Sequence, residues 1–384
     1  MREICAGYNE SGQRLDKLIR KVLPNANDSF IYKMLRKKNI TLNDKKASGS
    51  ETVQEGDVVR IWFSDETYAK FAGESADGGG VDGGLDLQHA FDKAIIYEDR
   101  DILVINKPAG MLSQKAAQDD ISVVELLTDN LLSRGEITRE QLKTFHPSIC
   151  NRLDRNTSGV LVCGKSLHGL QDMSELIRGR SVRKDYLAVV CGEVRQGQHI
   201  KAYLVKDHAG NKVKILDRLP NEGKPEAGNS ESVKARKKKN DEYRADRTDA
   251  EFIDTEFRPV YTNGDVSLIM VRIHTGKTHQ IRAQMAALGH PLCGDVKYGK
   301  ATAGSAELKC EGLHAGEDKG GGRSCRKKAD CRTYPRQLLH ACSLALPDGR
   351  RFIAPVPEDV KAAVGGYEWG HGRPADFEDL PLKI

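Results

Sequence analysis

The sequence predicts an α/β (α+β) protein in which strands outnumber helices, preceded by a small basic module. Apolar runs at residues 102–106, 160–163 and 266–273 are typical of buried strands. Residues 167–177 have the spacing of an amphipathic helix, and Ser122 is placed to cap another helix after it. At 384 residues, the chain suits two domains or one large core with a small attachment.

Residues 1–63 predict a basic module with two helices and a short sheet. Apolar residues recur at helical spacing from Leu15, and Asp28 or Ser29 is placed to cap a second helix. Short strands are expected at 40–44 and 56–63. The helix faces that do not carry the apolar stripes hold the basic residues Lys17, Arg20, Lys33, Arg36 and Lys37. Such faces favour phosphate binding, and the alternative is an ordinary solvated helix surface.

Three further segments differ in composition from their surroundings. Residues 64–89 are acidic and glycine-rich, which indicates a flexible linker. Residues 221–250 are charged with almost no apolar side chains, which indicates a solvated insertion. A second insertion at 301–335 holds several cysteines and a histidine, for which a zinc site is the alternative to a basic loop; they are Cys310, His314, Cys325 and Cys331. The tail at 365–384 has no pattern that assigns a structure.

Composition indicates a cytoplasmic protein. No stretch of apolar residues is long enough to span a membrane, and the first residues lack the apolar core of a signal peptide. The nine cysteines are scattered and odd in number, so we expect reduced thiols and no disulfide framework. The formal net charge of +5 alone does not demand a nucleic-acid partner.

Residues 151–159 hold the main candidate for chemistry. Asp154 lies between Arg152 and Arg155, in a loop that enters the predicted strand 160–163. Neighbouring positive charge favours the ionised carboxylate, which can act as a nucleophile. The alternative is a surface Asp–Arg pair that caps a turn. A second candidate is the loop at 275–278, because His279, Gln280 and Arg282 fall in the first turn of the helix that follows it.

Taken together, the motifs resemble the RluA-type family of RNA pseudouridine synthases over most of residues 90–360. The resemblance rests on five segments in the family's order: 101–110, 152–159, 184–186, 276–282 with 289–291 and 294–295, and 338–341. Residues 12–17, 35–43 and 55–59 resemble the S4 RNA-binding domain, of the αL type. The S4 part looks most like the RluC-like branch that modifies large-subunit ribosomal RNA.

The resemblance implies a fold and a set of roles. The expected fold is the pseudouridine synthase fold, a mixed and mainly antiparallel sheet with a catalytic cleft across its middle. Asp154 is the implied nucleophile, Tyr186 the base for the C5 proton, and Arg282 the partner of Asp154. Arg155 is expected to enter the RNA stack in place of the flipped base. Lys107 and Pro108 are expected to shape the cleft floor. No cofactor or metal is needed in this scheme.

Two positions depart from the family's pattern, and several readings of the target stay open. Asn151 stands where the family has His, and Lys277 where it has Arg. With Arg152 and His279, both are expected to contact RNA. The expected substrate is large-subunit ribosomal RNA, bound by a monomer. Alternatives are transfer RNA as substrate, or a non-catalytic RNA-binding or ribosome-assembly protein. A metal-dependent nuclease is disfavoured, because the sequence has no apparent cluster of carboxylates.

Overall fold

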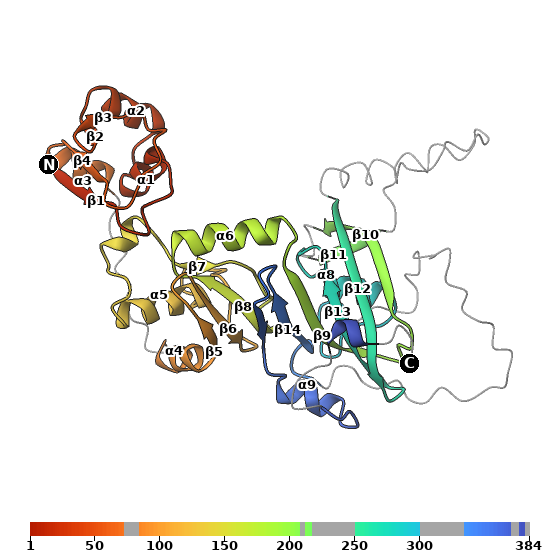
Figure 1. Cartoon of the computed structure of the whole chain (residues 1–384). Helices are drawn as coiled ribbons and strands as arrows, with labels where there is room; N and C mark the ends of the chain where they lie inside the picture. The colour runs from red at the N-terminus through yellow and green to blue at the C-terminus, as the bar shows by residue number, and fades with distance from the viewer. Residues whose placement is uncertain (73–83, 208–211, 217–249, 300–333, 370–375, 381–384) are drawn as a thin grey trace, which may run out of the picture. The chain divides into compact units, whose positions relative to one another are not determined.

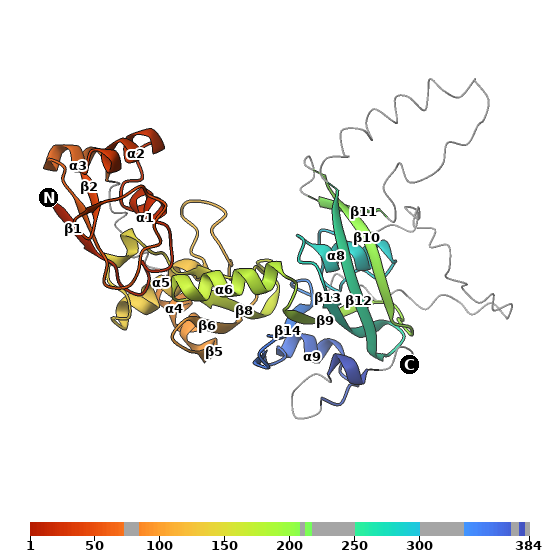
Figure 2. The same cartoon turned by 45° about the horizontal axis from the view of Figure 1, so that its top comes forward.

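The structure, a computed structural model, describes residues 1–72, 84–207, 212–216, 250–299, 334–369 and 376–380 (Figures 1 and 2). The chain divides into two compact units. Unit 1 comprises residues 1–155 and 161–179, and unit 2 comprises 156–160 and 180–384. Strand β8, Ser158–Gly164, therefore contributes residues to both units. Among the described helices, none is both long and apolar enough to cross a membrane.

The N-terminal module of unit 1 is a small sheet with helices, drawn in red in Figure 1. The antiparallel strands lie in the order β1 (Arg2–Cys5), β4 (Val58–Ile61), β2 (Ile40–Leu42) and β3 (Lys45–Lys46). Helices α1 (Leu15–Val22) and α2 (Asp28–Arg36) bury their apolar stripes in one core, which confirms both predicted helices. The predicted cap of α2 is wrong. Asn27 caps the helix, because its side chain accepts a hydrogen bond from the Phe30 N–H at 2.9 Å.

The flexible linker predicted at 64–89 is partly wrong, because helices occupy both of its ends. Helix α3 (Asp65–Phe71) is capped by Ser64, whose side chain accepts from the Thr67 N–H at 3.2 Å. Tyr68 and Phe71 then pack on the core of the N-terminal module. Helix α4 (Gly84–Lys93) forms the other end, and residues 73–83 lie outside the described ranges. The acidic composition of this segment therefore gave no indication that Tyr68 and Phe71 attach it to the N-terminal module.

The remainder of unit 1 combines short strands with two longer helices. Its strands are β5 (Ile95–Glu98), β6 (Ile102–Lys107), β7 (Ser148–Ile149) and the end of β8. Its helices are α5 (Val123–Ser133), the 3-10 turn η1 (Gln141–Lys143) and α6 (Leu167–Arg178). Ser122 and Glu125 form a capping box at the start of α5, which confirms the predicted cap. The helix predicted at 167–177 is also confirmed.

Unit 2 is built on a large, mostly antiparallel sheet. The strands run in the order β11 (Lys212–Leu216), β10 (Gln198–Asp207), β12 (Glu251–Thr262), β13 (Val266–Ile273), β9 (Arg183–Cys191) and β14 (Leu339–Ala345). The first residues of β8 pair in parallel with β14, and β15 (Arg351–Ile353) pairs with it antiparallel. Figure 2 shows the long strands β10 and β12 beside α8 (Gln280–Ala287), whose Ala283 packs on their apolar face. Helix α9 (Glu358–Ala363) follows β15. The mixed, mainly antiparallel sheet predicted for the fold is therefore present.

The C-terminal tail, unassigned from sequence, has an anchored segment. The short turn η4 (Phe377–Asp379) buries Phe377 between two guanidinium groups, with Arg258 Cζ at 4.6 Å and Arg272 Cζ at 4.1 Å from the ring centre. Arg258 also donates to the carbonyl oxygens of Phe377 and Leu380. The predicted insertions at 221–250 and 301–335, with Cys310, Cys325 and Cys331, fall almost entirely outside the described residues.

Candidate active site

Asp154 lies in the loop between β7 and β8, and hydrogen bonds fix the main chain on both sides of it. The Ser113 hydroxyl donates to the Leu153 carbonyl at 2.8 Å and accepts from the Leu153 N–H at 3.2 Å. The Arg155 carbonyl accepts from the Lys107 ammonium at 3.0 Å and from the Gly110 N–H at 2.9 Å. Leu153 is buried, whereas Asp154 is partly exposed. The carboxylate therefore projects from a backbone that residues 107–113 hold in place.

Lys107, at the end of β6, is fully buried and organises this loop. Its ammonium donates to the carbonyl oxygens of Pro108, Met111 and Arg155 at 2.9, 2.8 and 3.0 Å. A buried ammonium is tolerated only when such acceptors replace water. Lys107 therefore helps to position the Asp154 loop through its hydrogen bond to the Arg155 carbonyl. The sequence indicated a supporting role for Lys107 but not its partners.

The other predicted residues of this loop differ in their surroundings. The Asn151 side-chain oxygen accepts from the Val162 N–H at 2.8 Å, so this side chain joins the loop to β8. Arg152 and Arg155 are exposed. The Arg155 side chain lies against the segment that follows β6, where its Nε donates to the Gly110 carbonyl at 3.1 Å. Asn151 thus has a local structural partner that the sequence did not reveal.

After Arg155 the chain passes into unit 2, where Arg336 and a close backbone approach hold it. Arg336 donates to the Asn156 carbonyl at 3.1 Å and forms a double ion pair with Asp359, at 2.6 and 2.8 Å. Gly159 has φ +117°, and a Cβ atom at this position would lie 2.1 Å from the Ala341 carbonyl oxygen. Only glycine fits there. This explains the glycine of the motif at 152–159 in physical terms.

His340 on β14 is a buried residue that the sequence placed in a motif without a role. It is fully buried, and Nδ1 lies 3.0 Å from the Ser158 hydroxyl while Nε2 lies 3.3 Å from the Ala354 carbonyl. Burial lowers its pKa to about 4, so the ring is neutral near pH 7. A neutral ring donates from Nε2 and accepts from the Ser158 hydroxyl at Nδ1. His340 thereby connects β14 to the start of β8.

Tyr186 occupies the middle of β9, between β13 and β14. Its register partners are Val271 on β13 and Ala341 on β14, and its side chain is 8% exposed. Residues in one lateral row share a face of the sheet. The ring therefore has a small neighbour, Ala341, on one side and the backbone of Gly159 beyond it.

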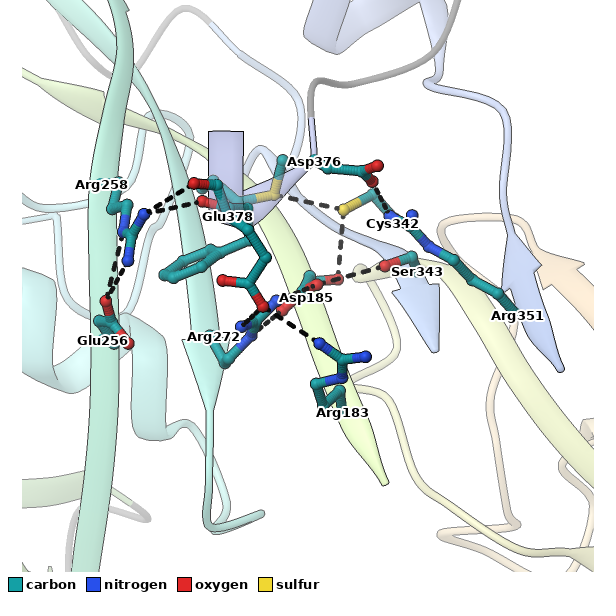
Figure 3. Close-up of polar contacts among 12 residues, drawn as sticks. Arg183, Asp185, Glu256, Arg258, Arg272, Cys342, Ser343, Arg351, Asp376 and Glu378 are labelled. Carbon is teal, nitrogen blue, oxygen red and sulfur yellow. Dashed lines mark hydrogen bonds and ion pairs between the residues drawn. The ribbon is translucent and has the colours of Figure 1, made fainter. Parts of the chain in front are cut away.

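Asp185, next to Tyr186 in the motif, projects to the opposite face of the sheet and is structural. Arg272 Nε and Nη2 donate to the two carboxylate oxygens of Asp185 at 2.7 and 2.9 Å (Figure 3). Arg272 also reaches Glu378 of the C-terminal segment at 2.7 Å. A cavity of about 270 Å³ lies beside these groups, lined also by Arg183 and Arg351. Since successive strand residues face opposite sides, this cavity is not on the side to which Tyr186 points.

Arg282, in the first turn of α8, forms a buried bidentate ion pair with Asp295. The Nε and Nη2 atoms lie 2.7 and 3.0 Å from the two carboxylate oxygens. Burial would raise the pKa of Asp295, but the bonds and charge of Arg282 and the N–H groups of Tyr298 and Lys297 outweigh it and lower the pKa. The sequence placed Asp295 in a motif but did not predict this pairing.

Gln280 holds the loop at 275–279 that leads into α8. Its side-chain oxygen accepts from the Lys277 N–H and from the Thr275 hydroxyl, each at 3.0 Å. Its amide nitrogen donates to the Thr255 hydroxyl at 2.9 Å. Of the predicted RNA contacts, Lys277 pairs with Glu251 at 2.9 Å, and His279 Nδ1 lies 3.1 Å from the Tyr298 hydroxyl. His279 itself adopts the left-handed conformation, with φ +56°.

The basic residues predicted on the N-terminal module divide into two groups. The exposed group consists of Lys17, Lys33, Arg36 and Lys37. Arg20 differs, because its guanidinium lies between Asp28 at 2.9 Å and Asp16 at 3.5 Å. The charge of Arg20 is therefore largely neutralised within the module, and the exposed group is the one able to meet phosphate.

Comparison with known proteins identifies the family. Residues 101–287 match the family model described as RNA pseudouridylate synthase. The chain is 30% identical over 288 residues, 74% of its length, to the "Uncharacterized RNA pseudouridine synthase MG370 homolog" of Mycoplasma pneumoniae, 77% of which is covered. It is 29% identical over 292 residues to the "Ribosomal large subunit pseudouridine synthase C" of Escherichia coli K12, with 76% and 77% covered.

A solved structure shows the same fold. The human protein "RNA Pseudouridylate Synthase Domain Containing 4" superposes with a TM-score of 0.51 at 20% identity. The match covers 73% of this chain and 95% of the human protein. The sequence matches establish that the chain belongs to the RluA family of RNA pseudouridine synthases, which are isomerases.

Proposed function

We propose that this enzyme converts uridine to pseudouridine in large-subunit ribosomal RNA, with Asp154 as nucleophile. The observation that carries the proposal is the clamp on the two neighbours of Asp154. Ser113 fixes Leu153, while Lys107 and Gly110 fix Arg155. A nucleophile must be held in one geometry relative to its target, and such a clamp reduces the entropic cost of reaching it.

The reaction is an isomerisation, so atoms and electrons balance within the uridine. The Asp154 carboxylate attacks the ribose C1′ or the uracil C6, and the bond between N1 and C1′ breaks. The base then turns, and C5 forms a bond with C1′. The proton on C5 leaves, and N1 gains a proton. No net oxidation or reduction occurs, and the carboxylate is released unchanged, so an aspartate and a base suffice.

Tyr186 and Arg282 complete the proposed chemistry. Tyr186 is the proposed base for the C5 proton, and its small neighbour Ala341 favours a flat ligand against the ring. Arg282 is proposed to support the negative charge of the Asp154 carboxylate. Asp295 favours this role because its two hydrogen bonds fix the plane of the guanidinium. A fixed charge costs less reorganisation during reaction than a mobile one.

The target base must leave the RNA stack before it reacts. Extrusion costs a few kcal/mol, and a planar guanidinium inserted into the gap offsets part of that cost. Arg155 is the proposed insert because it is exposed and adjacent to the nucleophile. Arg152, Lys277 and His279 are proposed to contact the surrounding RNA. The oxygen of Asn151 is engaged by Val162, so we propose that Asn151 acts through the shape of the loop.

The N-terminal module supports a large structured RNA as substrate. Three exposed basic residues, Lys33, Arg36 and Lys37, follow one another around the end of α2. Exposed cations at this spacing can meet successive phosphates, whatever the base sequence. The relatives named for large-subunit ribosomal RNA favour that target.

The proposal is tested by mapping pseudouridine in a strain that lacks the gene. We expect one or more large-subunit sites to lose the modification, the native gene to restore it, and Asp154→Asn to leave it absent at equal protein level. Loss of modification in transfer RNA alone would assign the other substrate. Restoration by Asp154→Asn would contradict the proposed nucleophile.

A further inference from the structure

Two histidines and an aspartate of unit 2 lie close together, and none of them has a role in the proposed reaction or RNA contacts. His199 lies on β10 and Asp254 on β12, and His274 directly follows β13. Their ligand atoms all lie within 4.8 Å of one another. His199 Nε2 is 2.7 Å from the Asp254 carboxylate, and the two imidazole rings are 5.6 Å apart between centres. The proposed isomerisation uses none of these groups.

We propose that His199, Asp254 and His274 form a binding site for a divalent transition-metal ion of the zinc class. Two imidazole nitrogens and one carboxylate oxygen are a donor set that zinc accepts, with water in the fourth position. Ligand atoms around a tetrahedral zinc ion are separated by about 3.3 Å, given metal–ligand distances of about 2.0–2.1 Å. The three ligand atoms here lie within 4.8 Å of one another, and rotation of their side chains would bring them to the separation that zinc requires.

The backbone beneath the cluster is held from several directions, as an effective metal site requires. The Asp254 N–H donates to the Thr275 hydroxyl at 2.9 Å, and the His274 N–H donates to the Asp254 carbonyl at 3.0 Å. The Gln280 amide also reaches that carbonyl, at 3.3 Å. His199 is fixed by the ladder between β10 and β12, in which it pairs with Glu256. The three ligands therefore project from positions that the sheet already defines.

The site gives the metal a structural task. His274 is the first residue of the connection from β13 to α8, and that connection carries Lys277 and His279 before Arg282. A metal ion that joins His274 to β10 and β12 would fix the start of this connection. This would add to the hydrogen bonds by which Gln280 holds Thr275 and Lys277. Side-chain exposure of 49% at His199 leaves the ion accessible from solvent. The metal is thus a staple for the loop and takes no part in the isomerisation.

A matched control lies on α6. His168 Nδ1 lies 3.1 Å from the exposed Asp172 carboxylate, a contact similar to that of His199 with Asp254 but in the other unit. If any surface His–Asp pair sufficed to bind metal, His168→Ala would lower the stoichiometry as much as His199→Ala. The cysteines at 310, 325 and 331 are a second possible source of binding. Replacing all three by Ser removes that source without touching the cluster.

The test titrates the metal-stripped full chain with Zn²⁺ by calorimetry and with Co²⁺ by visible absorption. We expect one equivalent to bind in the native chain, in His168→Ala and in the triple Cys→Ser variant. The cobalt spectrum should lack a thiolate charge-transfer band. We expect His199→Ala, His274→Ala and Asp254→Asn to weaken binding at least about 100-fold, since outer-shell changes alone cost 10- to 100-fold.

Hydrogen exchange provides a readout of the staple. Zn²⁺ should slow exchange of the amides at 274–280 in the native chain and not in His274→Ala. Unchanged binding in both histidine variants would overturn the proposed site, and so would the absence of any metal binding by the native chain. Binding without slower exchange at 274–280 would overturn the proposed task. None of these results depends on isomerase activity.

Discussion

The Lys107 ammonium and the Arg155 carbonyl oxygen lie 3.0 Å apart, and this contact joins the end of β6 to the loop that carries Asp154. Two further carbonyls, of Pro108 and Met111, share the same ammonium. The lysine side chain is fully buried. The position of Asp154 thus depends on a buried cation that lies outside the loop itself.

Lys107→Met should lower both stability and the turnover rate. It keeps most of the side-chain volume but removes the donor to the Pro108 and Met111 carbonyls and leaves the Arg155 carbonyl with the Gly110 N–H alone. This should cost about 3 kcal/mol of the free energy of unfolding. Turnover should fall more than RNA affinity does, because the Asp154 loop is misplaced while the proposed RNA contacts of the N-terminal module remain. Denaturant unfolding and single-turnover kinetics measure the two effects.

The control for this change is Lys115→Met. Lys115 lies nearby in sequence, but it is exposed, and its ammonium makes a loose ion pair with Glu125 at 3.7 Å and a long hydrogen bond to the Gln118 carbonyl at 3.4 Å. Stability should stay within about 0.5 kcal/mol of the native value. An equal effect of both substitutions would show that the buried contact of Lys107 has no special importance.

His340 should make the protein less stable in mild acid. Its folded pKa of about 4 lies below the ordinary value of 6.5, so the unfolded chain binds a proton that the folded chain does not. The stabilising contribution is complete above pH 6.5 and decreases as pH falls toward 4, by about 3 kcal/mol in total. The measurement is the free energy of unfolding at several pH values in the native chain and in His340→Asn. The two curves should converge as pH falls; parallel curves would contradict the assigned pKa.

Asp295→Asn should destabilise unit 2 strongly. The substitution removes the charge that balances the buried Arg282 guanidinium, and breaking a buried pair from one side costs about 3–5 kcal/mol. Glu140→Gln, which breaks the exposed pair with Lys143, should cost less than about 0.5 kcal/mol. Thermal and denaturant unfolding of the two variants make the comparison. A small effect of Asp295→Asn would mean that Arg282 finds another acceptor.

The exposed cations at α2 should set part of the salt dependence of RNA binding. Replacing Lys33, Arg36 and Lys37 by Gln should lower the slope of log affinity against log salt by about 2, since each lost phosphate contact contributes about 0.7–0.9. Replacing Lys45 and Lys46 on β3, also exposed, provides the control on the same module. If the control lowers the slope as much as the α2 variant does, the surface of α2 is not the specific contact.

Local signals in the sequence predicted much of the secondary structure. Apolar runs predicted β6 and β13, helical spacing predicted α6, and Ser122 marked the start of α5. The misses were of another kind. Asn27 caps α2, whereas the sequence had suggested Asp28 or Ser29. Tyr68 and Phe71 pack α3 on the N-terminal module, although the acidic composition of this segment had indicated a flexible linker.

The long-range partners of the candidate site could not be predicted from the residues alone. Nothing in the sequence connects Lys107 with Arg155, Asn151 with Val162, or Phe377 with Arg258, because each pair is set by how distant strands and loops meet. The same holds for His199, Asp254 and His274, which come from three different strands or their ends. The Arg282–Asp295 pair lies within one predicted region, and the spacing of 13 residues gave no signal of it.

The most direct test of Asp154 as the nucleophile is tritium release from RNA that carries 5-tritiated uridine. We expect release by the native chain and none by Asp154→Asn or Asp154→Ala, with RNA affinity within a few-fold of native. Asp119→Asn, an exposed carboxylate in the same unit, should release tritium at the native rate. Release by the Asp154 variants at the native rate would contradict the assignment of Asp154 as the nucleophile.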